Sequence, residues 1–147
     1  MSDTAIKRVG LIGLGKMGGP MVRHMLAGGF TVTGYDVHAE LIEAAAKDGA
    51  AAAASPAEVA AASELILIAV GFDAEVESAL FGTDGVMEGV SGGAIIAICS
   101  TIAPSTVTKI QKRIGAAPVR LIDCPLTRGE QAAIDGKMLT MVGGEEI

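Results

Sequence analysis

Three glycines near the N-terminus have a spacing that could place backbone amides around a phosphate. Gly13, Gly15 and Gly18 read G-x-G-x-x-G, directly after a short apolar run and at the start of a segment with helical periodicity. In this context the first glycine permits a tight turn, the second lets the main chain approach a pyrophosphate, and the third lets the helix pack close to the strand. The N-terminal end of the helix then faces the phosphates. The alternative is a sharp strand-to-helix turn in another kind of α/β domain.

An aspartate further along favours the phosphate interpretation. Asp36 ends the next apolar run, 18 residues after Gly18, where a carboxylate can accept hydrogen bonds from the hydroxyls of an adenosine ribose. The same carboxylate would repel a 2′-phosphate, and Val37 and His38, which follow it, supply no arginine to neutralise one. The sequence therefore predicts a dinucleotide site that prefers NAD to NADP. The predicted cofactor-binding residues in this part of the chain are Gly13, Leu14, Gly15, Lys16, Met17, Gly18 and Asp36.

The elements that must position these residues alternate between strands and helices. Apolar runs of strand length occupy residues 5–13, 30–35, 64–70, 94–99 and 119–124, with a weak strand at 50–53 and a last strand at 138–142. Helices are predicted at 15–29, 40–47, 73–81, 105–114 and 129–134, and a short one beginning at Ser55-Pro56. This alternation predicts a single α/β domain of the Rossmann type, doubly wound, with a mainly parallel sheet and helices on both faces.

Composition excludes several classes of protein. The chain has 147 residues, enough for one domain with a packed core, and 50% of them are apolar. A net charge of −6 without a basic stripe argues against nucleic-acid binding. The N-terminus has no secretory signal and no stretch reaches the roughly 20 apolar residues of a membrane span, so we expect a cytoplasmic protein. Cys99 and Cys124 lack metal or redox spacing, so buried free thiols and no metal site are predicted.

Three segments in order resemble the β-hydroxyacid dehydrogenases, which include 3-hydroxyisobutyrate dehydrogenase, tartronate semialdehyde reductase and the 6-phosphogluconate dehydrogenases. They are GLIGLGKMGGPM, STIAPST and DCPLTRGEQAAIDGKMLTMVGG, so the resemblance covers nearly the whole chain. It implies that Val70 and Gly71 pass the adenosine side of the cofactor, where the family often has Leu-Pro, and that Thr101 lies near the nicotinamide ribose. Ser100 and Thr101 also end a buried strand, where open α/β sheets bind ligands. Alternatively, one of them only caps the next helix.

The segment from Asp123 to Gly129 departs from the family pattern at a position that can select a substrate. Family members commonly read D-A-P-V-S-G-G, where the serine and glycines hold the substrate carboxylate. Here Thr127 replaces the serine and Arg128 the first glycine, so the resemblance implies substrate binding by Thr127, Arg128 and Gly129. An arginine fork can bind a carboxylate, phosphate or sulfonate bidentately, and a sulfolactaldehyde reductase branch resembles this arrangement. The alternatives for Arg128 are a solvated loop residue or an ion pair with Glu130.

The family's general acid or base is a lysine on the long helix that follows the nucleotide domain, and no lysine here matches it. His24 and His38 are expected in solvated or packing roles, so no catalytic residue is predicted in this chain. The resemblance thus implies that residues 1–147 are the cofactor domain of an NAD(P)-dependent β-hydroxyacid dehydrogenase or reductase, whose helical catalytic and dimerisation domain lies outside the chain. The parent is expected to be a homo-oligomer that transfers a hydride between the cofactor and a small anionic hydroxyacid or semialdehyde.

Other interpretations stay open. An imine or semialdehyde reductase could use the same domain, since the differences would lie mainly beyond position 147. A stand-alone dinucleotide-binding regulatory module is the alternative outside enzymes. In either enzyme case the isolated chain is expected to bind cofactor and turn over little or nothing. Without the resemblance, the residues reach only as far as a nicotinamide- or flavin-type dinucleotide domain.

Overall fold

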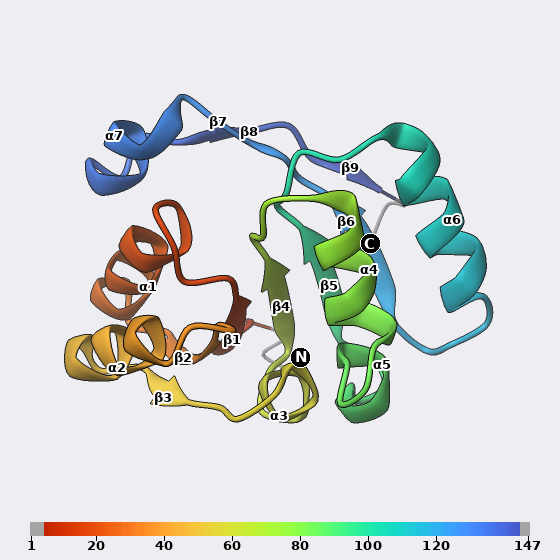
Figure 1. Cartoon of the computed structure of the whole chain (residues 1–147), viewed down its shortest axis with the longest axis horizontal. Coiled ribbons are helices and arrows are strands. Elements are labelled where there is room, and N and C mark those ends of the chain that lie inside the picture. The colour runs from red at the N-terminus through yellow and green to blue at the C-terminus, as the bar shows by residue number, and fades with distance from the viewer. Residues whose placement is uncertain (1–4, 145–147) are drawn as a thin grey trace.

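A seven-stranded sheet runs through the middle of the structure, a computed structural model that describes residues 5–144 (Figure 1). Its strand order is β3 (Ala51–Ala52), β2 (Thr31–Tyr35), β1 (Arg8–Ile12), β4 (Leu65–Ile68), β5 (Ile95–Ile98), β6 (Arg120–Asp123) and β9 (Gly143–Gly144). The first six are parallel, whereas β9 is antiparallel to β6. The start of the N-terminal stretch, used above to argue against a signal, and Ile147 lie outside the described residues.

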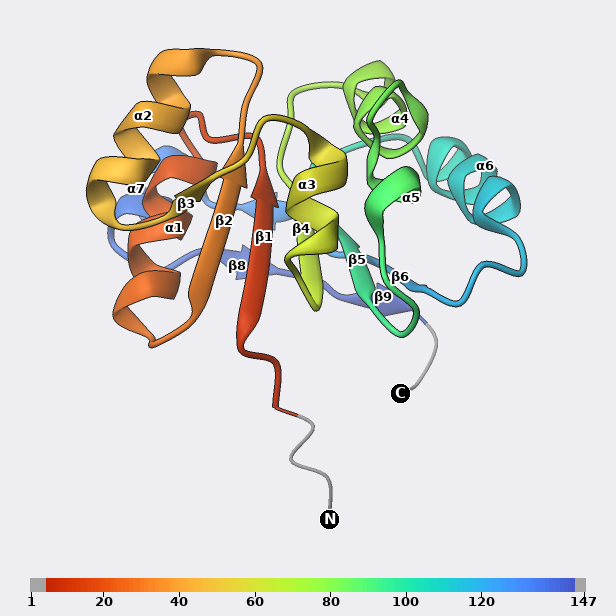
Figure 2. The ribbon, with the colours of Figure 1, turned by 90° about the horizontal axis from the view of Figure 1, so that it is seen from below.

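Helices cover both faces of this sheet (Figure 2). On one face lie α1 (Gly18–Ala27) and α2 (Ala39–Asp48); on the other lie α3 (Pro56–Ala61), α4 (Asp73–Phe81), α5 (Val86–Gly89) and α6 (Pro104–Ile114). Neighbouring residues of a strand point to opposite faces, so Leu11 packs in the core beneath α1 and α2, and Ile12 in the core beneath the other four helices. The predicted doubly wound, mainly parallel α/β fold is confirmed.

The central strands β4 and β5 are apolar along their whole length, and one face of each is fully buried. Ile66 and Ile68 of β4 and Ile96 and Ile98 of β5 are all fully buried. On the other face Leu65, Leu67 and Ile95 are partly buried and Ala97 is fully buried. Strands covered on both faces have continuous rather than alternating apolar sequences, which agrees with LILI and IIAI. Each such isoleucine contributes about 1.5–3 kcal/mol by burial, so these two strands form a rigid base for the loops at their carboxyl ends.

The start of α3 follows the predicted capping pattern. The Ser55 hydroxyl oxygen accepts from the Glu58 amide at 3.2 Å, and the Glu58 carboxylate accepts from the Ala54 amide at 2.7 Å. Pro56 is the first helical residue, where its missing N–H leaves no hydrogen bond unmade. The helix is therefore held at its N-terminus by side chains close to it in sequence, which is why the sequence predicts its position well.

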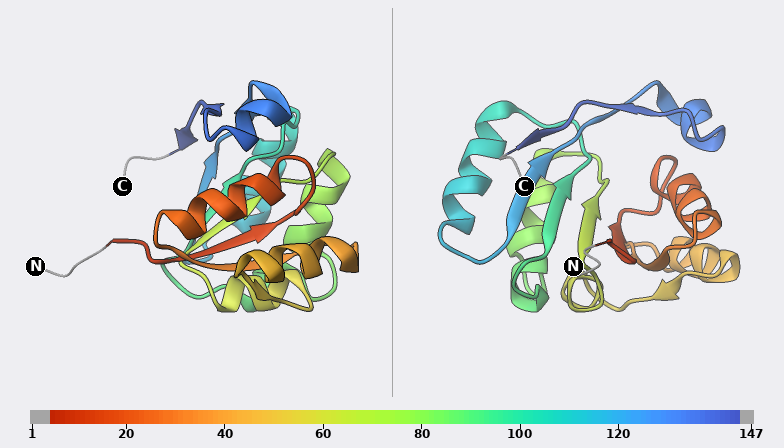
Figure 3. Two further views of the ribbon diagram at one scale, coloured as in Figure 1. Left: turned by 90° about the vertical axis from the view of Figure 1, so that its left-hand side faces the viewer. Right: turned by 180° about the vertical axis from the view of Figure 1, so that it is seen from behind.

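An arm extends from β6 across the molecule to α1 (Figure 1; Figure 3, right). We define the arm as residues 126–140; it contains β7 (Leu126–Thr127), α7 (Gly129–Ile134) and β8 (Leu139–Thr140). β7 and β8 pair with each other in a separate antiparallel ladder. At its far end the arm meets α1, where His24 Nε2 lies 2.9 Å from the Ile134 carbonyl oxygen. It also meets the loop just before α1, where Lys16 Nζ lies 3.8 Å from a Glu130 carboxylate oxygen.

The structure differs from the sequence prediction at the end of the chain. The run at 138–142 was predicted to be the last strand of the main sheet; instead its β8 pairs with β7 in the arm, and β9 forms the edge beside β6. Leu139, Met141 and Val142 are 47%, 65% and 66% exposed, so the apolar run is not buried in the sheet. The position of residues 138–142 is therefore decided by pairing with β7 and not by the hydrophobicity of the run.

The first helix also begins later than predicted, at Gly18 instead of Gly15. Gly13 has φ +95°, a left-handed backbone angle that a helix cannot use. The chain therefore needs residues 13–17 as a loop to turn from β1 into α1. This loop, called the glycine loop below, is the element on which the candidate site is built.

Candidate functional site

The glycine loop holds its shape through close backbone contacts. The Gly13 amide donates to the Tyr35 carbonyl of β2 at 2.9 Å. A Cβ on Gly18 would collide with the Gly13 carbonyl oxygen, so glycine at 18 is what lets α1 start so close to β1. A Cβ on Gly15 would meet no atom within 4 Å, so space is open above this residue. Inside the turn itself, the first backbone hydrogen bond runs from the Gly19 amide to the Gly15 carbonyl at 2.9 Å.

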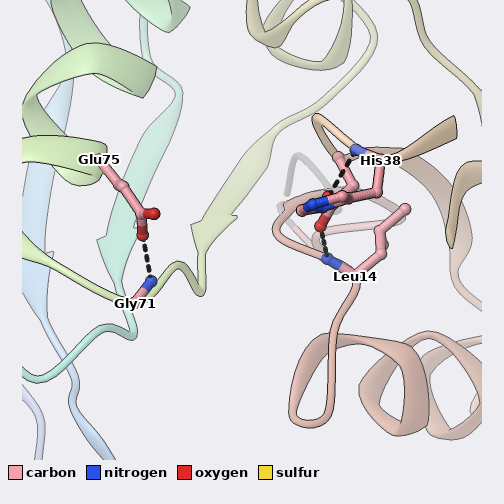
Figure 4. Close-up of polar contacts among 5 residues, drawn as sticks. Leu14, His38, Gly71 and Glu75 are labelled. Atoms are coloured by element: carbon pink, nitrogen blue, oxygen red, sulfur yellow. Dashed lines mark hydrogen bonds and ion pairs between the residues drawn. The ribbon is translucent and has the colours of Figure 1, made fainter.

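The Asp36 carboxylate reaches from the end of β2 to this loop. Its Oδ2 accepts from the Leu14 amide at 2.8 Å, and its Oδ1 accepts from the His38 amide at 2.9 Å. His38 Nδ1 lies 2.9 Å from the same Oδ1. Figure 4 shows Leu14 and His38 on the same side of the site. The acid side chain is only 11% exposed, so its two oxygens are held in place before any ligand arrives.

These contacts also set the charges of the pair. Burial by itself would raise the pKa of Asp36, but hydrogen bonds from the Leu14 and His38 amides and from the His38 ring outweigh it, and the pKa lies below the ordinary value. The hydrogen bond to Asp36 and its charge raise the pKa of His38 above 6.5. Asp36 is therefore an anion at neutral pH, able to accept hydrogen bonds but not to donate them.

A cleft of about 450 Å³ lies between the carboxyl ends of β1, β2 and β4. One wall carries Gly13, Gly15 and Asp36, and the opposite wall carries Val70, Gly71 and Glu75. The Glu75 carboxylate accepts from the Gly71 amide at 2.6 Å and from the Phe72 amide at 3.1 Å, which fixes the loop after β4. Figure 4 shows the Gly71–Glu75 contact across from Leu14 and His38. A crevice where the strand order reverses is where open α/β sheets bind dinucleotides.

Ser100 and Thr101 have different surroundings. The buried Ser100 hydroxyl donates to the Ile68 carbonyl at 3.3 Å and accepts from the Val70 amide at 2.9 Å, so it joins the ends of β4 and β5. Thr101 is exposed and is not among the residues that line the cleft. Neither caps α6, whose N-cap residue is Ala103. That alternative is wrong, because no side chain caps α6. The Asp73 carboxylate instead ties the start of α4 to the start of α6 by accepting from the Ala103 amide and the Thr106 hydroxyl.

The three predicted substrate residues lie together where β7 leads into α7. Arg128 and Gly129 both adopt left-handed angles, with φ +74° and +73°. Arg128 is exposed and its Nη1 donates to the Lys137 carbonyl at 3.4 Å, whereas Glu130 pairs with Lys16. The alternative of an Arg128–Glu130 ion pair is therefore not what the structure shows. The Thr127 hydroxyl donates to the Leu139 carbonyl at 3.0 Å, so its proton is used within the arm.

The geometry above agrees with a match to a known family. Residues 8–147 match the family model described as the NAD binding domain of 6-phosphogluconate dehydrogenase. The chain belongs to this family. The sheet order and the cleft beside the glycine loop agree with a domain of this kind. The match also agrees with the resemblance to hydroxyacid dehydrogenases found in the sequence. The chain is an NAD(P)-binding domain.

The curated relatives of the chain include enzymes of named activity. The chain is 35% identical over 136 residues to 3-sulfolactaldehyde reductase of Escherichia coli and 32% identical over 136 residues to 3-hydroxyisobutyrate dehydrogenase of Pseudomonas aeruginosa, covering 92% of this chain and 46% of each relative. Among solved structures, 3-hydroxyisobutyrate dehydrogenase from Salmonella typhimurium superposes with a TM-score of 0.88 at 31% identity, covering 95% of this chain and 49% of that one. The chain spans about half the length of the curated relatives it matches.

Two further solved structures bear on cofactor and reaction. Psf3, solved in complex with NADP+ and 2-OPP, has a TM-score of 0.86 at 26% identity and covers 93% of this chain and 49% of its own. An imine reductase from Pseudomonas sp. has a TM-score of 0.74 at 25% identity and covers 87% of this chain and 44% of its own. A structure of this fold has thus been solved with NADP+, and members of the fold carry different activities, so specific residues rather than the fold must decide the cofactor and the reaction.

The structure brings together most of the predicted cofactor residues and separates a few. Gly13, Gly15, Asp36, Val70 and Gly71 line the cleft, and Leu14 and Gly18 shape its loop. Lys16, whose side chain is 82% exposed, and Met17 and Thr101 are not among the lining residues.

Sequence reasoning missed two side chains that build the site, Glu75 and Tyr35, and it placed Ser100 at the strand end without finding its role there. Glu75 holds the loop after β4, Ser100 joins two strand ends, and Tyr35 lines the cleft. Glu75 at the third position of a helix was a detectable signal, because an acid there can accept from amides just before the helix. The part played by Ser100 has no local signal, because its partners are 30 and 32 residues away.

The remaining predictions concern thiols, metals and membranes. Cys99 and Cys124 are buried free thiols, as predicted, with their sulfur atoms 3.6 Å apart. Within residues 5–144, no three or more His, Cys, Asp or Glu side chains are grouped so that they could hold a metal ion. In the same part of the chain, no helix has the length and apolar character needed to cross a bilayer.

Proposed function

We propose that this chain binds NAD in preference to NADP in the cleft between the glycine loop and the loop after β4. The observation that carries the proposal is the Asp36 carboxylate, anchored to the Leu14 amide at 2.8 Å beside the glycine loop. In this position it can accept from the ribose hydroxyls while the amides at the N-terminus of α1 meet the pyrophosphate. The open space above Gly15 suits the phosphates. Lys16 and Met17 contribute backbone amides, and Thr101 meets the nicotinamide ribose.

The reaction we propose for the parent protein is reversible hydride transfer to or from a small β-hydroxyacid or its semialdehyde. When bound, the nicotinamide supplies the hydride chemistry. The chain contributes binding and orientation, and the resemblance to the dehydrogenases supports a lysine of the parent protein as the proton-transfer group. We also propose that the parent is a cytoplasmic homo-oligomer and that the chain alone turns over little.

Arg128 is proposed to read an anionic group on that substrate. The arm carries it to the side of the glycine loop, since Glu130, two residues later, lies 3.8 Å from Lys16. Its guanidinium is exposed and has one weak carbonyl contact at 3.4 Å, so it is free to bind a carboxylate or sulfonate through two hydrogen bonds. The amides of Arg128 and Gly129 add donors, and the Thr127 oxygen can accept. The similarity to 3-sulfolactaldehyde reductase supports a sulfonated substrate.

Calorimetric titration of the chain with NAD and NADP tests the cofactor proposal. NAD is expected to bind at least tenfold more tightly than NADP, because Asp36 repels a 2′-phosphate, and Asp36→Asn is the control that should narrow the difference. Equal affinities would contradict the preference, and no heat with NAD at millimolar levels would contradict the site itself.

A substrate panel on the parent protein tests the reaction. It would compare hydroxyisobutyrate, tartronate semialdehyde, succinic semialdehyde and sulfonated or phosphorylated analogues, with a cyclic imine as the arm for an imine reductase. That second function is favoured by the likeness to an imine reductase structure. Turnover of the imine alone would replace the hydroxyacid proposal. If Arg128→Ala left the Michaelis constant unchanged for every anionic substrate, Arg128 would have no part in substrate recognition.

A further inference from the structure

His38 is a titratable group of the cleft that the proposed function does not use. It follows β2, occupies the N-cap position of α2 and lines the cleft together with Asp36. Its side chain is 63% exposed and its Nδ1 lies 2.9 Å from Asp36 Oδ1. The imidazole thus sits on the carboxylate that, under the proposed function, meets the adenosine ribose. A substituent on the ribose 2′ oxygen would arrive beside this ring.

The charges around His38 are otherwise negative. Asp36 is in direct contact and Glu40, in the first turn of α2, acts on it from its own helix. Glu75 of α4 stands on the opposite wall, and Tyr35 is the remaining titratable group of the lining. Within the described residues, the lining of the cleft contains no lysine or arginine. His38 is therefore the group through which this wall can become less negative.

We propose that His38 makes the choice between NAD and NADP depend on pH. When the ring is neutral, the Asp36–His38 pair has a charge of −1 and repels a 2′-phosphate. When the ring is protonated, Nδ1–H donates to Asp36, the pair is neutral, and Nε2–H is available to the phosphate. NADP binding then improves as the pH falls, while NAD, which lacks that phosphate, is little affected. The inference rests on the proposed function, since it requires the ribose at Asp36.

The expected size separates this effect from a background that all NADP sites share. A phosphate monoester loses its second proton with a pKa of about 6, so NADP becomes less negative at low pH by itself. An imidazolium within hydrogen-bond reach of the phosphate, at a surface exposed to water, adds a preference of about tenfold. The hydrogen bond to Asp36 and its charge raise the pKa of His38 above the ordinary value, which favours the protonated ring.

Calorimetry of the whole chain with NAD and NADP at about pH 6 and about pH 8.5 tests this, because lowering the pH favours the protonated form of the His38 ring. The ratio of NADP to NAD affinity is compared in wild type and His38→Gln. It should rise about tenfold more in wild type than in His38→Gln on going to the lower pH. His24→Gln is the matched control, a histidine on α1 bound to the arm, and should behave as wild type. Equal changes in wild type and His38→Gln overturn the proposal.

Titration of the imidazole by NMR gives a second readout on the wild-type chain, which does not depend on a variant folding. By linkage, a tenfold preference of NADP for the protonated ring must appear as a rise of about one unit in the pKa of His38 when NADP saturates the site. With NAD the pKa should stay near that of the free chain. An unchanged pKa with NADP bound overturns the inference and leaves the cofactor site standing. If neither nucleotide binds, the proposed function fails and the inference fails with it.

Discussion

The two regions of this molecule that we propose bind anions are built in opposite ways. The proposed cofactor cleft is assembled from the ends of β1, β2 and β4, and its acid is 11% exposed with both oxygens bonded. The proposed substrate loop lies on the arm, where Arg128 is exposed and held by one contact at 3.4 Å. Both use glycine at a positive φ, yet only the arm places a non-glycine residue, Arg128, in that conformation.

The difference teaches where each kind of specificity can change. The cleft is formed by the ends of three strands of the sheet, so its shape is set before a ligand binds. A substitution that changes the cleft therefore also disturbs the sheet, and we expect the mode of cofactor binding to change little. The arm contacts the rest of the domain through few polar pairs, so a substitution such as glycine to arginine is accommodated. An arginine in the left-handed region costs about 1 kcal/mol, and a strained residue beside a site is expected to serve that site.

The largest expected effect compares two glycines of the loop. Gly18→Val should lower the free energy of unfolding by about 3 kcal/mol or more, because its side chain collides with the Gly13 carbonyl. Gly15→Val, the matched control, enters open space and should unfold near wild type, while weakening NAD binding at least tenfold by filling the phosphate position. Urea unfolding and calorimetry measure the two effects. Similar loss of stability in both variants would refute the distinction between packing and binding glycines.

The next effect concerns the acid of the cleft. Asp36→Asn should raise the dissociation constant of NAD about 10- to 100-fold, because hydrogen bonds between ribose hydroxyls and a carboxylate are replaced by weaker neutral ones. Asparagine has nearly the same shape as aspartate, so the free energy of unfolding should change less than the free energy of NAD binding. Glu75→Gln, across the cleft, is the comparison and should have the smaller effect on NAD. A larger loss at Glu75 would mean that the ribose lies against the other wall.

A smaller effect is expected at the arm. Arg128→Gly should stabilise the chain by up to about 1 kcal/mol, because glycine adopts the left-handed angle without a steric penalty. In the parent protein the same change should raise the Michaelis constant for sulfonated substrates and leave NAD affinity unchanged. Thermal unfolding and steady-state kinetics measure the two. Destabilisation together with unchanged kinetics would show that Arg128 is a structural residue of the arm.

The smallest expected effect is a loss of stability at low pH that depends on Asp36. Because the pKa of Asp36 is lowered in the folded chain, its contribution to stability is present above the ordinary carboxyl pKa of 3.8 and is lost as the pH falls through the folded value. Wild type should therefore lose stability more steeply than Asp36→Asn below about pH 4. Urea midpoints of the two across this range measure the difference, and parallel curves would mean that Asp36 titrates alike in both states.

Some of the fold and the site is readable from local sequence and some is not. Helix α3 was predicted because its cap, Ser55 and Glu58, lies within its own first turn. The glycine loop and Asp36 were predicted because backbone angles and a fixed spacing demand those residue types. The position of 138–142 was not, since a two-residue ladder has no hydrophobic signature of its own and depends on β7 folding back toward it.

By itself, the sequence determined the alternation of buried strands and helices, the loop where glycine is required at 13 and 18, and the acid at the end of the second strand. These depend on backbone angles and on side-chain polarity at fixed distances along the chain. Tertiary structure alone decided that Ser100 joins β4 to β5 and that Glu130 pairs with Lys16 rather than Arg128. The physical reason is range: hydrogen bonds and ion pairs act over a few ångströms, and only the folded sheet brings groups distant in sequence within that distance.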